Sequence, residues 1–232
     1  MKKLILILAV TTLVIGANAQ SSFGIQAGAN FASVKSEDGG TTMTSDTKVG
    51  FTIGILADID FGNQVSFRPE LNFIQKGGKQ NETSTTNGFT SNDEIDLALG
   101  YIQLSPNFVY NFNPGSASIF IGVGPELSFG VGGKAKFKST VTGPGLNESE
   151  SGSVDVKFDG KENPSDDNLH LKSVDYGANI LAGYKLANGA FISAGYTLGL
   201  ANISPENNSS FKNRGFNVKI GYTFGGSGNA QK

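Results

Sequence analysis

The single histidine of the chain, His170, is the first residue whose type could support catalysis. Asp166, Asp167 and Ser173 lie close to it in the sequence, and acyl transfer needs a histidine beside a carboxylate and a hydroxyl nucleophile. Their spacing does not align them as a triad, and an exposed loop histidine is the simpler interpretation. The sequence therefore predicts a protein with no catalytic residues, and not an enzyme.

Acidic residues in the same region could bind Ca²⁺ only loosely. They are Glu148, Glu150, Asp159, Glu162, Asp166 and Asp167. The fixed spacing of an EF-hand loop is missing, and a chain without cysteine has no thiolate ligands. No phosphate loop, dinucleotide fingerprint or zinc motif occurs. We therefore expect no metal and no cofactor, and a net charge of −2 gives no electrostatic footprint for nucleic acid.

A period-two pattern must position the other charged side chains. Apolar residues, with a few prolines among them, occupy every second position of eight runs, and such alternation is typical of strands. The runs are 23–31, 51–59, 65–73, 102–112, 119–129, 176–186, 190–200 and 216–224. The intervening positions are rich in glycine and small polar residues, so each strand has two opposite faces.

The apolar face is expected to point outward. An eight-stranded barrel has an interior only just wide enough for side chains to fill, which suits the glycine-rich face better than the aromatic one. An apolar exterior is stable only in lipid, where a closed barrel satisfies the backbone of its strands. A soluble two-layer sandwich is the alternative, but it leaves the glycine-rich face unexplained. The sequence thus predicts an all-β fold, an eight-stranded antiparallel transmembrane β-barrel.

The connections between runs alternate in length. Those at 32–50, 75–94, 130–175 and 201–215 are long or medium, whereas those at 60–64, 113–116 and 187–189 are short. Outer-membrane barrels have short periplasmic turns and long external loops, so this alternation supports the barrel. Aromatic residues near the strand ends are expected to form girdles at the two membrane interfaces. The outer girdle comprises Phe31, Phe51, Phe73, Phe129, Tyr176 and Phe216.

Three prolines interrupt this simple pattern. Pro69, Pro106 and Pro125 lie inside runs and remove ladder hydrogen bonds. The alternation also slips by one residue at 101–102. We expect bulges or irregular pairing at these places.

The first residues have the features of a secretory signal. Lys2 and Lys3 precede an apolar stretch at 4–16, and Ala17-Asn18-Ala19 is a small-x-small cleavage site. The predicted organisation is a signal peptide over 1–19, an outer-membrane β-barrel over 20–225 and a flexible tail over 226–232. The expected location is the outer membrane, reached by export and signal cleavage.

Several short motifs together resemble the outer-membrane β-barrel family of Gram-negative bacteria that includes the PorT-like proteins, often filed as "porin family". They are Phe23-Gly24-Ile25-Gln26-Ala27-Gly28-Ala29-Asn30-Phe31, Arg68-Pro69-Glu70-Leu71, Leu104-Ser105-Pro106, Gly122-Val123-Gly124-Pro125 and Asn213-Arg214. The resemblance covers nearly the whole mature chain and implies the barrel fold. It supplies no catalytic residues, and for one branch it implies an accessory role in protein secretion.

Charged residues on the predicted inner face are expected to pair, because an isolated charge in a narrow lumen is costly. We predict a lumen charge network of Asp58, Arg68, Glu70, Glu126, Lys185 and Lys219, with Asp175 on the same face. Such a network would plug the barrel. A thin polar channel among the same groups is the alternative.

The connection at 130–175 carries a second candidate site. Lys134, Lys136 and Lys138 alternate, as do Asp155 and Asp159 with apolar residues, which indicates a hairpin above the membrane. This hairpin could bind an extracellular or envelope protein, or simply pair with itself in solvent. The expected protein is a monomer in outer-membrane lipid, a closed small barrel acting through its surface loops in adhesion, envelope structure or interaction. The alternatives are a passive porin for small solutes and an accessory component of a protein-secretion system.

Overall fold

The computed structural model describes residues 21–112, 117–162 and 165–225. The predicted signal peptide, the tail at 226–232 and the short turn at 113–116 lie outside the described residues. Most of the described residues lie in β-strands. The strands are β1 (Ser21–Asp38), β2 (Thr41–Thr44), β3 (Lys48–Asp60), β4 (Val65–Thr86), β5 (Phe89–Phe112), β6 (Ser118–Gly143), β7 (Leu146–Lys157), β8 (Leu169–His170), β9 (Val174–Lys185), β10 (Ala190–Gly199) and β11 (Ser209–Phe224).

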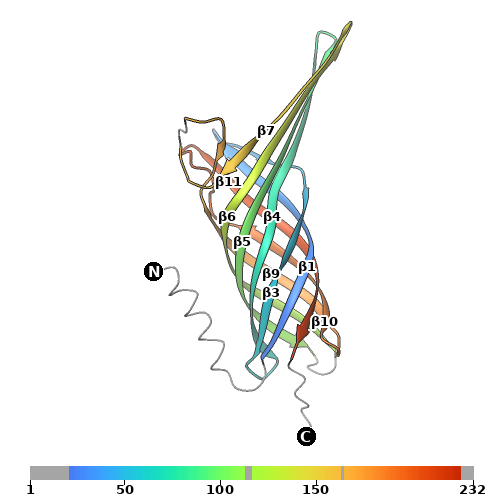
Figure 1. The fold of residues 1–232 in the computed structure, drawn as a ribbon, viewed down its shortest axis with the longest axis vertical. Coiled ribbons are helices and arrows are strands. Elements are labelled where there is room, and N and C mark those ends of the chain that lie inside the picture. Colours follow the sequence, from blue (N-terminus) through green and yellow to red (C-terminus); the bar gives the residue numbers. More distant parts are fainter. Residues whose placement is uncertain (1–20, 113–116, 163–164, 226–232) are drawn as a thin grey trace.

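Eight of these strands form a closed ring (Figure 1). The order is β5-β4-β3-β1-β11-β10-β9-β6, and a further pairing of β5 with β6 joins the two ends. All eight contacts in the ring are antiparallel. In the part of the chain that the structure describes, no helix is long and apolar enough to cross a membrane.

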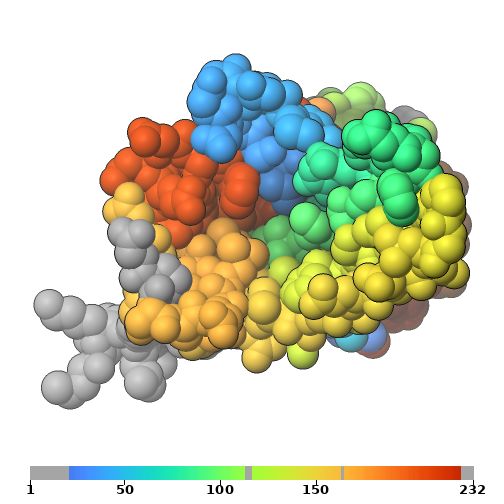
Figure 2. Space-filling view, turned by 90° about the horizontal axis from the view of Figure 1, so that it is seen from above, coloured from blue at the N-terminus to red at the C-terminus, as the bar shows by residue number. Residues whose placement is uncertain are grey.

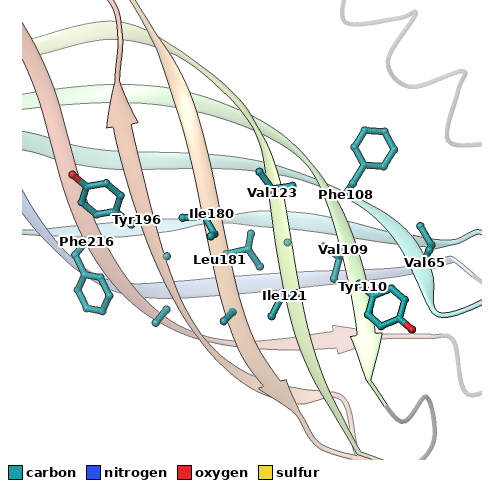
Figure 3. Close-up of a pocket in the computed structure, with 14 residues that line it drawn as sticks. Val65, Phe108, Val109, Tyr110, Ile121, Val123, Ile180, Leu181, Tyr196 and Phe216 are labelled. Carbon is teal, nitrogen blue, oxygen red and sulfur yellow. The ribbon is translucent and has the colours of Figure 1, made fainter.

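The two faces of the ring have opposite chemistry. The outward positions of the predicted runs expose large apolar side chains, such as Ile25, Ile53, Val123, Ile180 and Ile220. A hollow in this wall is lined by side chains of six neighbouring strands, from Val65 of β4 to Phe216 of β11, and Figure 3 shows these side chains. The inward positions of the same strands are largely buried and polar. The predicted outward orientation of the apolar face is therefore correct.

Three strands of the ring continue past it as a projecting sheet. It consists of 77–86 of β4, 89–100 of β5, 132–143 of β6 and the added strand β7 (Figure 1). The prediction of a long loop at 75–94 is wrong, because β4 and β5 pair up to Thr86 and Phe89. The predicted hairpin in 130–175 is present, but its second arm is β7 rather than an extension of β9.

The pairing is irregular where the prolines lie. Pairs between β5 and β6 stop at Leu104 with Leu127 and resume at Phe108 with Val123, so Pro106 and Pro125 fall in the gap. The register between the same strands also shifts at 100/101. These interruptions confirm the expectation of irregular ladders and let the proline residues lie within a closed ring.

The inner face is less uniformly polar than the sequence analysis expected. At the lower end, Leu56, Val109, Phe120, Leu181 and Phe191 pack together inside the ring as the apolar floor. Near the projecting sheet a second buried cluster forms the apolar cap. Its members are Ile74, Leu99, Tyr101, Val156, Leu171 and Ile203. Most of the buried polar side chains therefore lie between two apolar clusters.

Seen from above, the cap region shows how distant segments meet. In Figure 2 the segment leading into β9 (orange) lies beside the upper end of β11 (red), and both face the green and yellow strands of the projecting sheet across the mouth of the ring. Backbone hydrogen bonds tie these segments together, including Lys172 N–H to the carbonyl of Ile203 at 2.8 Å.

Candidate functional site

The upper ionic group of the interior is centred on Lys76 of β4. Its Nζ donates hydrogen bonds to Glu126 Oε1 at 2.5 Å, Asp175 Oδ2 at 3.0 Å and Ser128 Oγ at 3.1 Å. Asn213 Nδ2 donates to the same Asp175 oxygen at 3.0 Å. All of these side chains are buried, so one ammonium holds two carboxylates out of contact with water.

Two further ionic groups lie below it. Lys219 Nζ donates to Glu70 Oε2 at 2.5 Å, and Gln26 Nε2 donates to the same oxygen at 2.8 Å. Nearer the lower end, Arg68 Nη2 donates to Asp58 Oδ2 at 2.7 Å, with Lys185 Nζ 3.7 Å from that oxygen. The Asp58 carboxylate is thus shared between two cations.

The predicted lumen residues all lie inside the ring, but direct contacts divide them into these three groups. Glu126 contacts none of the predicted cations, and its partner is Lys76. That residue escaped the sequence analysis because it was assigned to an external loop. A strand continued past Phe73 would have placed Lys76 on the same face as Arg68 and Glu70, because even numbers of positions separate these residues.

Aromatic rings join the ionic groups to the apolar layers. The Arg68 guanidinium lies over the Phe120 ring at 4.2 Å from its centroid, and Lys76 Nζ lies 5.1 Å from that of Tyr101. Cation–π contact of this kind is favoured when the cation is desolvated. The floor and the cap therefore pack directly onto the charged groups.

The residues of the predicted external hairpin lie on the projecting sheet. Lys134 and Asp155 face each other across β6 and β7, with Nζ 3.4 Å from Oδ1. Lys136 and Lys138 lie opposite Ser153 and Ser151. Their acidic neighbours are instead on β5.

Register on the β5 side places opposite charges together. Asp96 is opposite Lys136, and Glu94 is opposite Lys138. Lys79 of β4 is in turn opposite Asp96. Because directly opposed residues share one face of a sheet, the charged face of the projecting sheet has alternating basic and acidic columns.

Asp159 belongs to a different cluster, which contains His170. The expectation of an exposed loop histidine is wrong, because the His170 side chain is buried. Its Nδ1 lies 2.6 Å from Asp159 Oδ1 and its Nε2 lies 2.7 Å from Asp166 Oδ1. Lys157 Nζ donates to Asp166 at 2.6 Å, and Lys161 Nζ lies 3.6 Å from Asp159.

The two carboxylates change the protonation of the histidine. Hydrogen bonds to Asp166 and then to Asp159 raise the pKa of His170 above its usual value. Hydrogen bonds from Lys157 and His170 lower the pKa of Asp166, and the bond with His170 lowers that of Asp159. Only the imidazolium can donate from both ring nitrogens, so the cluster is complete only when His170 is charged.

We expect the segment around this cluster to loosen at alkaline pH. A raised pKa means that the stabilisation is complete below the usual histidine value of about 6.5 and is lost as pH rises through the folded value. Tryptic cleavage after Lys161, divided by cleavage of a reference peptide at each pH, should rise as the pH increases above the usual histidine value of about 6.5. The His170→Gln variant should be cleaved fast at every pH. If cleavage of the parent changes with pH as little as cleavage of the variant, charged His170 does not stabilise this segment.

Among the described residues, no group of three or more His, Asp or Glu side chains is placed to hold a metal ion. A ring of antiparallel strands with an apolar outer face and a buried, ion-paired interior is the construction of a membrane-spanning barrel.

The sequence comparison agrees with this class. The chain belongs to the outer membrane protein beta-barrel domain family, whose match covers residues 18–205. Membership of this family places the protein in the outer membrane. No curated protein matches the chain by sequence.

Several solved outer-membrane proteins are similar to the chain. Ail, the attachment invasion locus protein of Yersinia pestis, is 17% identical with a TM-score of 0.40, covering 89% of this chain and 100% of Ail. Neisserial surface protein A is 16% identical with a TM-score of 0.40 and the same coverage. The outer membrane enzyme PagL is 14% identical with a TM-score of 0.42, covering 83% of this chain and 98% of PagL.

Proposed function

We propose that this protein is a closed, monomeric eight-stranded outer-membrane barrel whose projecting sheet binds an extended segment of an extracellular or envelope partner. The observation that carries the proposal is the outer edge of β7. Among the described residues, β7 pairs with β6 along its length but with β8 only at Val156 and Lys157. The edge at 146–155 therefore has unpaired backbone groups, which can accept another strand.

The chemistry of the partner follows from the side chains of β7. Glu148 and Glu150 are exposed and share one face of the strand, whereas the other face carries three serines, with Asp155 beyond them. Acidic residues at alternate positions favour an incoming strand with basic residues at alternate positions. The partner is therefore an extended segment of alternating basic character.

A synthetic peptide can test this edge. The segment 133–142 of β6 already pairs with β7 and carries lysine at alternate positions, so a labelled copy of it is the probe. We expect saturable binding to the full-length protein in detergent, weakened about tenfold or more when two central residues of the peptide are proline, because proline cannot join a ladder. Equal binding of the two peptides contradicts the proposal.

Three alternatives have less support. Passage of small solutes needs an open lumen, whereas the ionic groups, the cap and the floor all pack side chains inside the ring. The PorT-like resemblance implies an accessory of secretion, which co-purification of a stable complex would favour. Acyl-transfer chemistry is disfavoured because carboxylates occupy both ring nitrogens of His170.

A further inference from the structure

Three basic residues gather on the outer face of β1 and β11, at the level where the strands leave the membrane. Lys35 is directly opposite Lys212, and Arg214 is opposite Ser33 one step closer to the membrane. The next pair on the same face is Phe31 with Phe216, whose ring centroids are 6.3 Å apart. We call Lys35, Lys212 and Arg214 the basic rim cluster.

The basic rim cluster is electrostatically unfavourable by itself. Like charges directly opposite each other destabilise a strand pair, and in the described part of the chain no carboxylate forms an ion pair with any of the three. Arg214 Nε is buried and has no hydrogen-bond partner. Side chains beside Lys35 offer little compensation, since β2 places Thr44 opposite it and Glu37 is opposite Ser210.

The projecting sheet shows that this arrangement is particular to the rim. There, Lys79, Lys136 and Lys138 each lie opposite an acidic residue of β5. Only at the rim do two lysines face each other between paired strands of the described chain. An anion supplied from outside the chain would convert this repulsion into attraction.

The position of the cluster identifies where that anion comes from. Aromatic side chains of membrane barrels lie at the headgroup level, and Phe31 and Phe216 are such residues, both exposed on the outer wall. Arg214 is two residues beyond Phe216, or about 7 Å along the strand. Its neighbour on β10 is Leu198, which is also exposed. An acyl chain can therefore lie against the wall below the charged groups.

We propose that the basic rim cluster binds the phosphate group of a phosphorylated lipid in the outer leaflet. A guanidinium donates two parallel hydrogen bonds to a phosphate, and the two ammonium groups neutralise its remaining charge. Apolar wall below and cations above match a lipid with an acyl chain and a phosphorylated headgroup. The inference depends on the outer-membrane location and is independent of the proposed partner strand.

The test compares the unfolding temperature of a charge-reversal variant with that of the parent. In Lys212→Glu the new carboxylate faces Lys35, so the variant should unfold at a higher temperature than the parent in vesicles of phosphatidylcholine alone. Adding phosphatidic acid to the vesicles should raise the unfolding temperature of the parent by several degrees and leave that of the variant unchanged. The unfolding temperature is read from heat-dependent mobility on gels.

The controls separate a lipid site from general charge effects. Lys79→Glu makes the same change of charge on the projecting sheet. Its unfolding temperature should rise with phosphatidic acid as much as that of the parent. Inorganic phosphate added to phosphatidylcholine vesicles should not reproduce that gain, and if it does, the site binds a free anion and the lipid assignment is wrong. A gain by Lys212→Glu equal to that of the parent also overturns the proposal.

A second variant covers the case in which Lys212→Glu does not fold. Native mass spectrometry should detect phosphatidic acid retained by the parent and several-fold less retained by Lys35→Ser/Lys212→Ser. The control variant Lys79→Ser/Lys161→Ser also loses two positive charges, and it should retain the lipid as the parent does. Equal retention by both double variants contradicts the site.

Discussion

Replacing Lys76 by methionine is expected to destabilise the barrel by about 3–5 kcal/mol, the cost of breaking a buried ion pair by removing one partner. The ammonium of Lys76 is the shared donor for Glu126 and Asp175. Methionine fills similar space but leaves two carboxylates facing each other inside the ring, and buried charges without a counterion are strongly unfavourable. The effect should appear as a lower urea midpoint for loss of the fast-migrating folded band on gels.

Matched variants distinguish the effect of breaking the buried ion pair from the effect of removing any lysine side chain. Lys79→Met, three residues further along β4, removes a largely exposed side chain whose Nζ is 3.9 Å from Asp96. We expect a change of about 0.5 kcal/mol or less, as for other surface pairs. The triple variant Lys76→Met/Glu126→Gln/Asp175→Asn should recover most of the loss. If that triple variant is no more stable than Lys76→Met, the lost stability does not come from unpaired charge.

The reason that Lys76 could not be found from the sequence is physical. The apolar alternation of β4 ends near Phe73 because the strand there leaves the lipid, and beyond that point its outer face no longer needs apolar side chains. The backbone ladder with β5 nevertheless continues to Thr86. A pattern that reports lipid contact therefore marks the limits of the membrane, and the ends of the strands lie beyond them.

The ring itself was predictable for the same reason. Lipid imposes one chemistry on every second residue of eight strands, and that constraint is visible in each run independently. The interior has no comparable rule. Gln26, Arg68 and Lys219 are inward by parity, but which carboxylate each one contacts depends on the stagger between strands distant in sequence, as the contact of Lys219 with Glu70 shows.

The apolar floor has a signal in the sequence that is separate from the alternation of the strands. Phe120 lies between two outward isoleucines, and Val109 lies between Phe108 and Tyr110. Three consecutive apolar residues in a strand place one of them on the inner face. Such triplets occur near the lower end of several strands, and a search for them would have located the floor.

Replacing Phe120 by alanine is expected to open this floor and to destabilise the barrel by about 3–5 kcal/mol, as for other buried phenylalanines. The Phe120 ring is fully buried, packs edge-on against Phe191 with centroids 6.5 Å apart, and contacts the Arg68 guanidinium. Its removal leaves a cavity beside a charged group, and water can enter a cavity that has polar partners.

Planar bilayers report the consequence for the lumen. In the proposed closed barrel the cap and the floor block the polar interior, so the parent should give no steady openings. Phe120→Ala combined with Leu171→Ala, which also thins the cap, should conduct small ions. Phe89→Ala makes the same deletion at the tip of the projecting sheet and should stay silent. Large steady openings of the parent refute the closed barrel, whereas a silent double variant that still folds shows that the ionic groups alone block the lumen.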